Sequence, residues 1–167
     1  EKEREKLNAA YFGIGDLEVS NNDEMLAYSL DLKGSEYFTI YVRKISDNKI
    51  ISDEIHETSG SVTWSLDDKY IFYSKLDEHH RPRKIYRHQI GTKTKDDQLI
   101  YEEKDQGFTC GISISSDEKY FFISTSDHTT SEIYFFDVND LSPKPKLFRK
   151  RQKEIRYSVD SWKENFF

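Results

Sequence analysis

The sequence predicts an all-β protein: an incomplete β-propeller of about three four-stranded antiparallel blades plus the start of a fourth. The first observation is an eleven-residue pattern that occurs three times, as VSNNDEMLAYS at 19–29, WSLDDKYIFYS at 64–74 and ISSDEKYFFIS at 114–124. The second is its spacing, since the serines Ser20, Ser65 and Ser115 are 45 and 50 residues apart. Repeats of roughly 40–50 residues that contain several short strands are typical of propeller blades.

The third observation is that the middle of each repeat is apolar at consecutive positions, in MLAY at 25–28, YIFY at 70–73 and YFFI at 120–123. A strand with one face in water would alternate apolar and polar residues, so these strands are expected to be covered on both faces. A blade has a neighbouring blade on each side, whereas each sheet of a two-sheet sandwich is covered on one face only. The pattern therefore favours a propeller.

The elements can be predicted in chain order. Residues 1–11 contain good helix formers with little apolar face, which predicts a short helix or a linker before a partial propeller domain at 12–167. The blades are expected at 12–58, 59–106 and 107–153, and residues 154–167 begin the next one. Each blade has an inner strand, a tight turn, a central strand, a longer loop, a third strand and an edge strand. We expect inner strands at 16–20, 61–65 and 109–115, third strands at 40–45, 85–90 and 133–138, and edge strands at 49–55, 98–103 and 145–150.

The last residues predict a blade that is only begun, with an inner strand at 155–160, a turn in SWKEN and a central strand starting at Phe166. Closed propellers need about four to eight blades, so we expect this chain to be a piece of a larger protein. The lack of a starting Met also suggests that Glu1 is not a natural N-terminus. Self-association through exposed blade faces is expected if the neighbouring blades are missing.

Short polar residues occupy the turns between inner and central strands: Asn21, Asn22 and Asp23, then Asp67 and Asp68, then Ser116, Asp117 and Glu118. Such side chains bond their own backbone and tolerate the left-handed conformation that tight hairpins need. Asp67 and Asp68 are also candidate calcium ligands, but the alternating carboxylates and the glycine of a calcium loop are missing. The turn interpretation is therefore favoured.

Composition and charge exclude several classes of partner. The net charge is −6, and the 25 basic residues are scattered among 31 acidic ones, which argues against nucleic acid and anionic membranes as partners. The longest apolar runs are about six residues, far below the roughly 20 that a membrane helix needs. The single cysteine rules out an internal disulfide and fits a reducing compartment, so a cytoplasmic location is expected.

No metal site and no cofactor is predicted. His79 and His80 are adjacent in sequence, which gives no ligand spacing, and His56, His88 and His128 are isolated. A catalytic or structural metal needs several ligands at defined spacings.

Three further residues have an ordinary interpretation beside a functional one. Cys110 alternates with Ile112 and Ile114 on a predicted inner strand, which favours packing over a nucleophilic role. Trp64 and Trp162 lie at or beside the ends of inner strands, where core packing is the default and a place in the central channel is the alternative.

Several segments resemble the propeller of oligopeptidase B (protease II), a group within the prolyl oligopeptidase family. They are residues 53–92, LIYEEKDQGF at 99–108, HTTSEIYFFD at 128–137 and RYSVD at 156–160, and the resemblance extends from about Phe12 to the last residue. It implies a seven-bladed, non-catalytic propeller that caps an α/β-hydrolase domain. In the complete enzyme this propeller would admit only short peptides, which would be cleaved after Arg or Lys.

The chemistry of that family is missing from these residues, so the chain alone is expected to be no enzyme. A serine hydrolase of this kind needs a Gly-x-Ser-x-Gly turn, with a distant Asp and His. No such turn occurs, and Ser59-Gly60-Ser61 leads directly into a predicted inner strand. The resemblance places the catalytic residues further along the chain, so none is assigned. Two functions remain: a piece of a gating and docking propeller that works with the missing blades and the hydrolase domain, or a free-standing protein-binding scaffold.

Three long charged loops between central and third strands are the candidate site, at 31–39, 75–84 and 127–132. Alternate strand connections of a propeller emerge at one face, so we expect these loops around one mouth of the channel and the tight turns at the other. Glu36, Arg81 and Glu132, one from each loop, are predicted to contact the hydrolase domain or to gate substrate. The alternative is that they are solvated surface charges.

Overall fold

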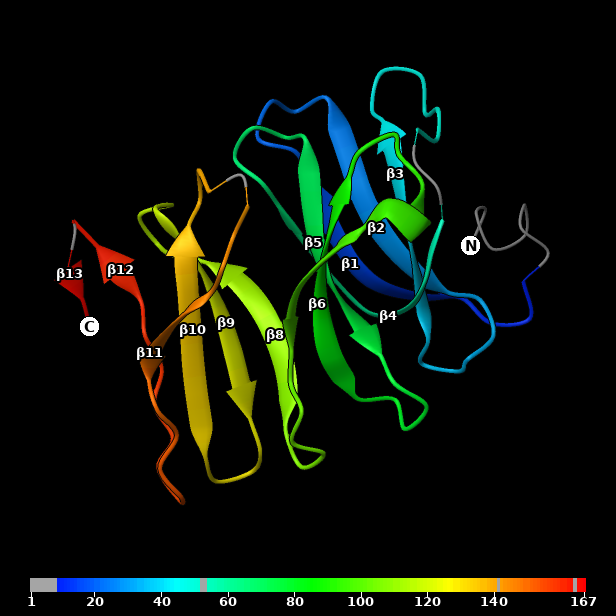
Figure 1. Cartoon of the computed structure of the whole chain (residues 1–167). Coiled ribbons are helices and arrows are strands. Elements are labelled where there is room, and N and C mark those ends of the chain that lie inside the picture. Colours follow the sequence, from blue (N-terminus) through cyan, green and yellow to red (C-terminus); the bar gives the residue numbers. More distant parts are fainter. Residues whose placement is uncertain (1–8, 52–53, 141, 164) are drawn as a thin grey trace.

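The computed structural model describes residues 9–51, 54–140, 142–163 and 165–167 (Figure 1). Residues 1–8, most of the predicted helix or linker at 1–11, lie outside the described residues. The described part contains a 3-10 turn, η1 (Thr94–Asp96), and thirteen strands. In chain order the strands are β1 (Gly13–Val19), β2 (Met25–Asp31), β3 (Phe38–Lys44), β4 (Ile55–Trp64), β5 (Tyr70–Leu76), β6 (Pro82–Gln89), β7 (Gln98–Glu102), β8 (Thr109–Ile114), β9 (Tyr120–Ser126), β10 (Ser131–Asp137), β11 (Lys146–Arg149), β12 (Ser161–Trp162) and β13 (Asn165–Phe166).

The strands form the predicted partial β-propeller. One hydrogen-bonded sheet contains β1 to β7 in sequence order, a second contains β11-β10-β9-β8, and β12 pairs with β13. The strands that pair within each sheet are antiparallel and adjacent in sequence, which is the meander of a propeller blade. The seven-stranded sheet therefore holds the first two blades, and the four-stranded sheet is the third.

The first two blades share one strand. The first part of β4 pairs with β3 through Ile55 and Thr58, and its last part pairs with β5 through Val62 to Trp64. Gly60, at φ 94°, lies between the two parts, and a glycine can take this left-handed conformation without steric cost. β4 thus runs across residue 58, where the sequence placed a blade boundary.

The predicted edge strand at 49–55 is found in part, because Lys49 and Ile51 hydrogen-bond to β3. Ile50 makes an isolated bridge to Arg43, and the regular partner of β3 begins only at Ile55. Residues 52–53 lie outside the described part of the chain. The pairing with β3 extends beyond residue 55 because the edge strand continues directly into the inner strand of the second blade, which local sequence pattern does not reveal.

The core consists of two apolar layers, one between each pair of neighbouring blades. The layer between blades one and two contains Ala27, Ile40, Val42, Ile55, Val62, Trp64, Ile71 and Tyr73. The layer between blades two and three contains Phe72, Ile85, Ile100, Cys110, Phe121, Ile123 and Phe136. Ile71 and Tyr73 of β5 enter the first layer while Phe72 enters the second, so the central strand is covered on both faces as predicted.

The three tight turns have the same structure, which confirms their interpretation from sequence. The hydroxyl of the leading serine accepts a hydrogen bond from the N–H five residues later, at 2.9 Å in the first blade and 3.0 Å in the others. The residue three positions after that serine has φ between 57° and 60° in each turn, namely Asp23, Asp68 and Glu118. Short polar side chains lower the cost of this conformation.

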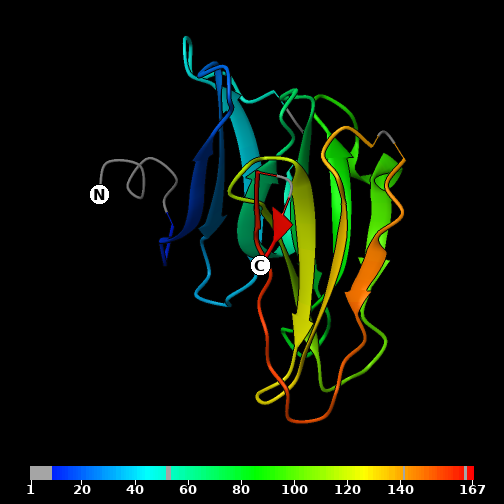
Figure 2. The ribbon, with the colours of Figure 1, turned by 90° about the vertical axis from the view of Figure 1, so that its left-hand side faces the viewer.

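The C-terminal residues form a short hairpin against the third blade (Figure 2, red). The ring of Phe166 lies 5.0 Å from that of Tyr120 and 5.3 Å from those of Phe135 and Phe148. The strand predicted at 155–160 is wrong: Tyr157 exchanges hydrogen bonds with the Ser131 hydroxyl in place of a strand ladder. Glu164, in the predicted turn, lies outside the described residues.

Candidate functional site

The long loops gather at one end of the strands, and the tight turns lie at the other. Figure 1 shows the β5–β6, β7–β8 and β9–β10 connections together at the lower end of the molecule. The first two loops touch, because the Tyr37 hydroxyl donates to the Asp77 carbonyl at 3.1 Å and the Tyr37 ring lies 4.1 Å from that of His80. We call residues 32–37, 77–81, 103–108 and 127–130 the loop end.

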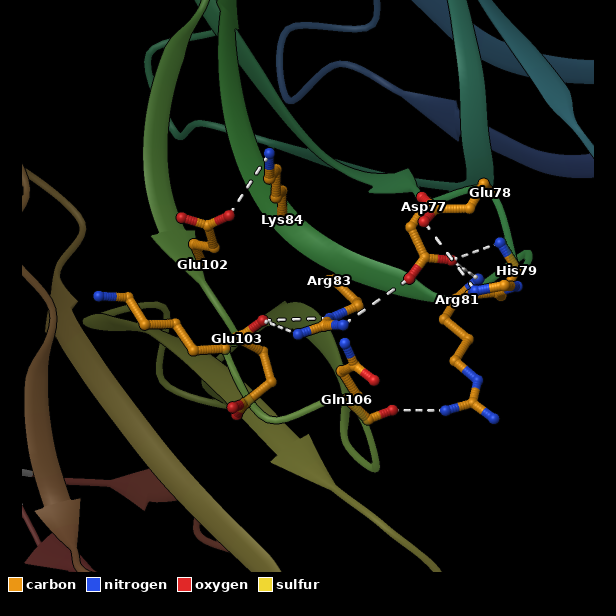
Figure 3. Close-up of a pocket in the computed structure, with 10 residues that line it drawn as sticks. Asp77, Glu78, His79, Arg81, Arg83, Lys84, Glu102, Glu103 and Gln106 are labelled. Atoms are coloured by element: carbon orange, nitrogen blue, oxygen red, sulfur yellow. Dashed lines mark hydrogen bonds and ion pairs between the residues drawn. The ribbon is translucent and has the colours of Figure 1, made fainter.

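A polar depression of about 730 Å³ opens at the loop end (Figure 3). Its lining residues come from the second blade and the connection to the third: Asp77, Glu78, His79, Arg81, Arg83, Lys84, Glu102, Glu103, Lys104 and Gln106. Arg83 donates two hydrogen bonds to the Glu103 carbonyl, at 3.1 and 2.8 Å. Lys84 lies 3.4 Å from the Glu102 carboxylate. Arg83 and Lys84 are thus held in place by partners within the depression.

Asp77 fixes the shape of the loop that carries Arg81. Its carboxylate accepts the backbone N–H of His79 at 2.8 Å and of Arg81 at 3.0 Å. Burial by itself would raise the pKa of Asp77, but these hydrogen bonds and the positive charge of Arg83 lower it. The Asp77 carboxylate is therefore ionised at neutral pH, and the loop is pre-formed.

The first loop is built in the same way around Asp31. Its carboxylate accepts the N–H groups of Lys33 and Gly34, each at 2.9 Å, and of Glu36 at 2.8 Å. Burial by itself would raise the pKa of Asp31, but these hydrogen bonds lower it. Glu36 has φ 61° and is exposed. Two of the predicted site residues, Glu36 and Arg81, thus lie on pre-formed loops at one end, and the Arg81 guanidinium donates to the Gln106 carbonyl.

Glu132 differs from the expectation. It is 4% exposed and belongs to β10, so the alternative of a solvated surface charge is wrong for it. Its carboxylate accepts hydrogen bonds from the Arg151 guanidinium at 2.9 and 3.1 Å and from the Tyr134 hydroxyl at 2.9 Å. The residue is directed into the protein because Arg151, from the segment after β11, folds over it.

Arg151 joins Glu132 to a second buried carboxylate, Glu103, at 2.8 Å. Glu103 also accepts the hydroxyls of Thr125 and Tyr101, and the Arg151 guanidinium lies 4.0 Å above the Phe108 ring. We call Glu103, Glu132 and Arg151 the carboxylate–arginine cluster. Burial by itself would raise the pKa of Glu103 and Glu132, but these hydrogen bonds and the Arg151 charge lower the pKa of both carboxyls. Sequence analysis missed this cluster, since its members share no motif.

The other sequence candidates have structural roles. Trp64 is buried in the core and its indole N–H donates to the Glu18 carbonyl at 3.0 Å, which confirms the default interpretation of core packing. Trp162 is 51% exposed. Burial, followed by the charge of Glu103, raises the pKa of the Cys110 thiol to about 12, so this cysteine is unsuited to act as a nucleophile.

His88 is completely buried, and its Nδ1 lies 2.7 Å from the Asp97 carboxylate. Among the described residues, no group of three or more His, Cys, Asp or Glu side chains is arranged to hold a metal ion. Within the same residues, no helix has the length and apolar character to cross a membrane.

Antiparallel blades that follow one another along the chain, with pre-formed polar loops gathered at one end, define a propeller domain. Residues 7–167 match the family described as prolyl oligopeptidase, N-terminal beta-propeller domain. The chain belongs to this family, and the resemblance seen in the sequence is confirmed.

Known relatives agree with this assignment. Protease 2 of Moraxella lacunata is 33% identical over 157 residues, which are 93% of this chain and 23% of that protein. Oligopeptidase B from Leishmania major superimposes with a TM-score of 0.90 at 25% identity, over 96% of this chain and 23% of that one. Oligopeptidase B from Trypanosoma brucei superimposes with a TM-score of 0.86 at 27% identity, over 96% of this chain and 22% of that one. The chain spans about a quarter of the length of these relatives.

Proposed function

We propose that this chain is part of the non-catalytic propeller of a serine oligopeptidase that cleaves short peptides after Arg or Lys. Its tasks are to restrict access to the catalytic centre and to dock against the α/β-hydrolase domain. The observation that carries the proposal is the family match over residues 7–167, together with relatives named protease 2 and oligopeptidase B. The single cysteine, which cannot form an internal disulfide, supports a cytoplasmic location for the enzyme.

The loop end is the surface that we assign to docking and gating. Rigid loops on a sheet scaffold are well suited to hold contacts with a second domain, and Asp31 and Asp77 pre-form two of them. The Trypanosoma brucei relative has been solved in a closed form with covalently bound antipain. A closed form is consistent with a propeller surface that meets the hydrolase domain when a peptide-like ligand is bound.

The test uses charge reversal in the complete enzyme. Glu36→Lys and Arg81→Glu are expected to raise KM or lower kcat for short Arg and Lys peptides, because they alter exposed charges at the docking surface. The matched control is Lys95→Glu, an exposed charge in η1 outside the loop end. Kinetics unchanged from wild type in both loop-end variants would contradict the gating and docking role.

The 167-residue chain by itself is expected to hydrolyse no peptide. It has no nucleophile on a Gly-x-Ser-x-Gly turn for a histidine to activate. The measurement is release of a fluorophore from an Arg or Lys substrate by the purified chain, with a serine-directed inhibitor as control. Inhibitor-sensitive turnover would contradict the proposal that this part of the enzyme is non-catalytic.

A further inference from the structure

The tight turns carry backbone N–H groups that hold a carboxylate from the next blade. In the first blade, the Asp68 carboxylate accepts the N–H of Asn21 at 2.7 Å and the N–H of Asn22 at 3.0 Å. It also accepts the Asn21 side-chain amide at 2.8 Å. Asp68 belongs to the turn of the second blade, so this carboxylate joins the two blades at their tight-turn end.

The turn of the third blade also holds a carboxylate, through one backbone N–H and one hydroxyl. The Asp160 carboxylate accepts the N–H of Ser116 at 2.9 Å and the Ser116 hydroxyl. These bonds, and one from the Ser161 N–H, lower the pKa of Asp160. Asp117 lies beside this site, which shows that an acidic residue within the turn does not prevent the turn from binding a carboxylate.

The turn of the second blade has the same backbone but no carboxylate. The corresponding donors are the N–H groups of Leu66 and Asp67, and neither has a hydrogen-bond partner within the described residues. In the third blade Glu118 occupies the position of Asp68, with φ 57°. Glu118 is exposed, and its carboxylate makes no hydrogen bond in the part of the chain that the structure describes.

Leu66 and Asp67 are among the residues that line a cavity of about 100 Å³ between blades two and three. It is lined by Ser65, Leu66, Asp67, Tyr70, Phe72, Arg87, Phe136, Val138, Asn139 and Asp140. The Arg87 guanidinium lies 4.4 Å above the Tyr70 ring and donates to Gln98 at 2.7 Å, so it brings a fixed positive charge to the cavity.

Two acidic residues also line the cavity, and both are engaged elsewhere. The Asp67 carboxylate accepts the Ser65 hydroxyl at 2.7 Å and lies 3.2 Å from the Lys69 ammonium. Asp140 accepts the N–H of Ser142 at 2.9 Å. Neither carboxylate bonds the open donors of Leu66 and Asp67.

We propose that the second turn is a binding site for a carboxylate supplied by another molecule, the Asp or Glu side chain or the C-terminus of a partner polypeptide. The ligand takes the place that Asp68 and Asp160 fill in the other two turns. Its two oxygens accept the N–H groups of Leu66 and Asp67, and the Arg87 charge stabilises it. Hydrogen bonds to a charged acceptor are stronger than neutral ones, so a pair of N–H groups suffices to hold the anion.

The test is a titration of the 15N-labelled chain with sodium acetate, compared with sodium chloride at equal ionic strength. We expect saturable shifts of the Leu66 and Asp67 amide signals with acetate only. The amides of Asn21 and Asn22 should not respond, because Asp68 occupies them. Leu66→Pro removes one donor at the second position of the turn, where proline is favoured, and should weaken acetate binding about tenfold or more. Equal responses to both salts, or an undiminished acetate response in L66P, would overturn the proposal.

Two variants and two peptides complete the experiment. Asp160→Ala should give the Ser116 amide an acetate response of its own, as a positive control for the turn geometry. Glu118→Gln should leave the Leu66 amide unchanged; a shift in the absence of acetate would show that Glu118 is the occupant and would refute an external ligand. A blocked peptide with one Asp and an unblocked peptide with only its C-terminal carboxylate distinguish the two sources of the ligand.

Discussion

Arg151 is a single residue that holds several elements of the structure together. Its guanidinium contacts two carboxylates from different parts of the chain, and the side chains of Glu103 and Glu132 are 4% and 6% exposed. Buried carboxylates are costly without a partner, so the arginine is needed to keep both ionised. The segment after β11 is thereby held against the second and third blades.

Arg151→Met is expected to destabilise the chain by about 3 kcal/mol at neutral pH, because it leaves two buried carboxylates without a counter-charge. Urea unfolding measures the change. Lys153→Met is the matched control on the same segment, since the Lys153 side chain is 90% exposed, and it should change stability by less than about 0.5 kcal/mol.

The same variant has a defined pH dependence. In the native chain the pKa values of Glu103 and Glu132 are lowered, so they contribute stability above the unfolded carboxyl pKa of about 4.3, and this is lost as pH falls through the folded values. The difference between wild type and R151M should therefore shrink below about pH 4. If the difference in stability between wild type and R151M stays constant down to acid pH, then the loss of packing explains the destabilisation and the loss of charge pairing does not.

Cys110 gives a second prediction about a single residue. It is 4% exposed, and its thiol pKa is raised to about 12, so iodoacetamide should modify it at least about a hundredfold more slowly in the native chain than in urea at pH 8. Ser113→Cys places an exposed thiol on the same strand as a control. Mass spectrometry of this variant should show modification at position 113 first. Rapid native labelling of Cys110 would mean that blades two and three separate readily.

At the scale of elements, β4 is the strand that joins two blades. Its first part pairs with β3 and its last part pairs with β5, and the change of partner occurs around Gly60. A Cβ at Gly60 would lie 3.0 Å from the Phe38 ring, and φ is 94°. Both facts make any other residue at this position strained.

Gly60→Ala is therefore expected to destabilise the chain by about 2 kcal/mol through backbone strain and crowding. Gly111→Ala on β8 is the matched control, because an added Cβ there meets nothing within 4 Å and the residue has no left-handed φ. Its effect should be within about 0.5 kcal/mol of zero. Thermal melts of the two variants compare them directly, and equal melting temperatures would argue against a strained bend.

At the scale of the whole molecule, the outer face of the first blade is apolar and open. On β1, Ile14, Leu17 and Val19 are 54%, 55% and 48% exposed. The faces between the blades are covered by a neighbouring blade, whereas these three side chains stay about half exposed in the described residues. An apolar strand of this kind tends to associate.

We expect the 167-residue chain to self-associate through this face. Sedimentation velocity over a range of concentrations should show dimers or larger species, and Leu17→Lys with Val19→Glu should shift the distribution toward monomer. Ile45→Lys, at a position that is 44% exposed outside β1, is the control that should leave association unchanged. A monomer at all concentrations for the wild-type chain would contradict the expectation.

The sequence by itself determined the features that depend on neighbours along the chain. The repeat spacing, the serine-led turns and the central strands with two apolar faces were predicted because side-chain periodicity and turn hydrogen bonds span only a few residues. The positions of Glu36 and Arg81 at one end followed from the alternation of strands. The family resemblance was likewise readable from short segments.

Only the tertiary structure decided the features that join distant residues. Arg151 meets Glu132 and Glu103 across 19 and 48 positions, so nothing local distinguishes the buried Glu132 from an exposed charge. The shared strand β4 depends on two partners at once, and the open donors of Leu66 become visible only when the three turns are compared in space. Long-range pairing fixes such features, because hydrogen-bond partners and burial are set by which segments meet.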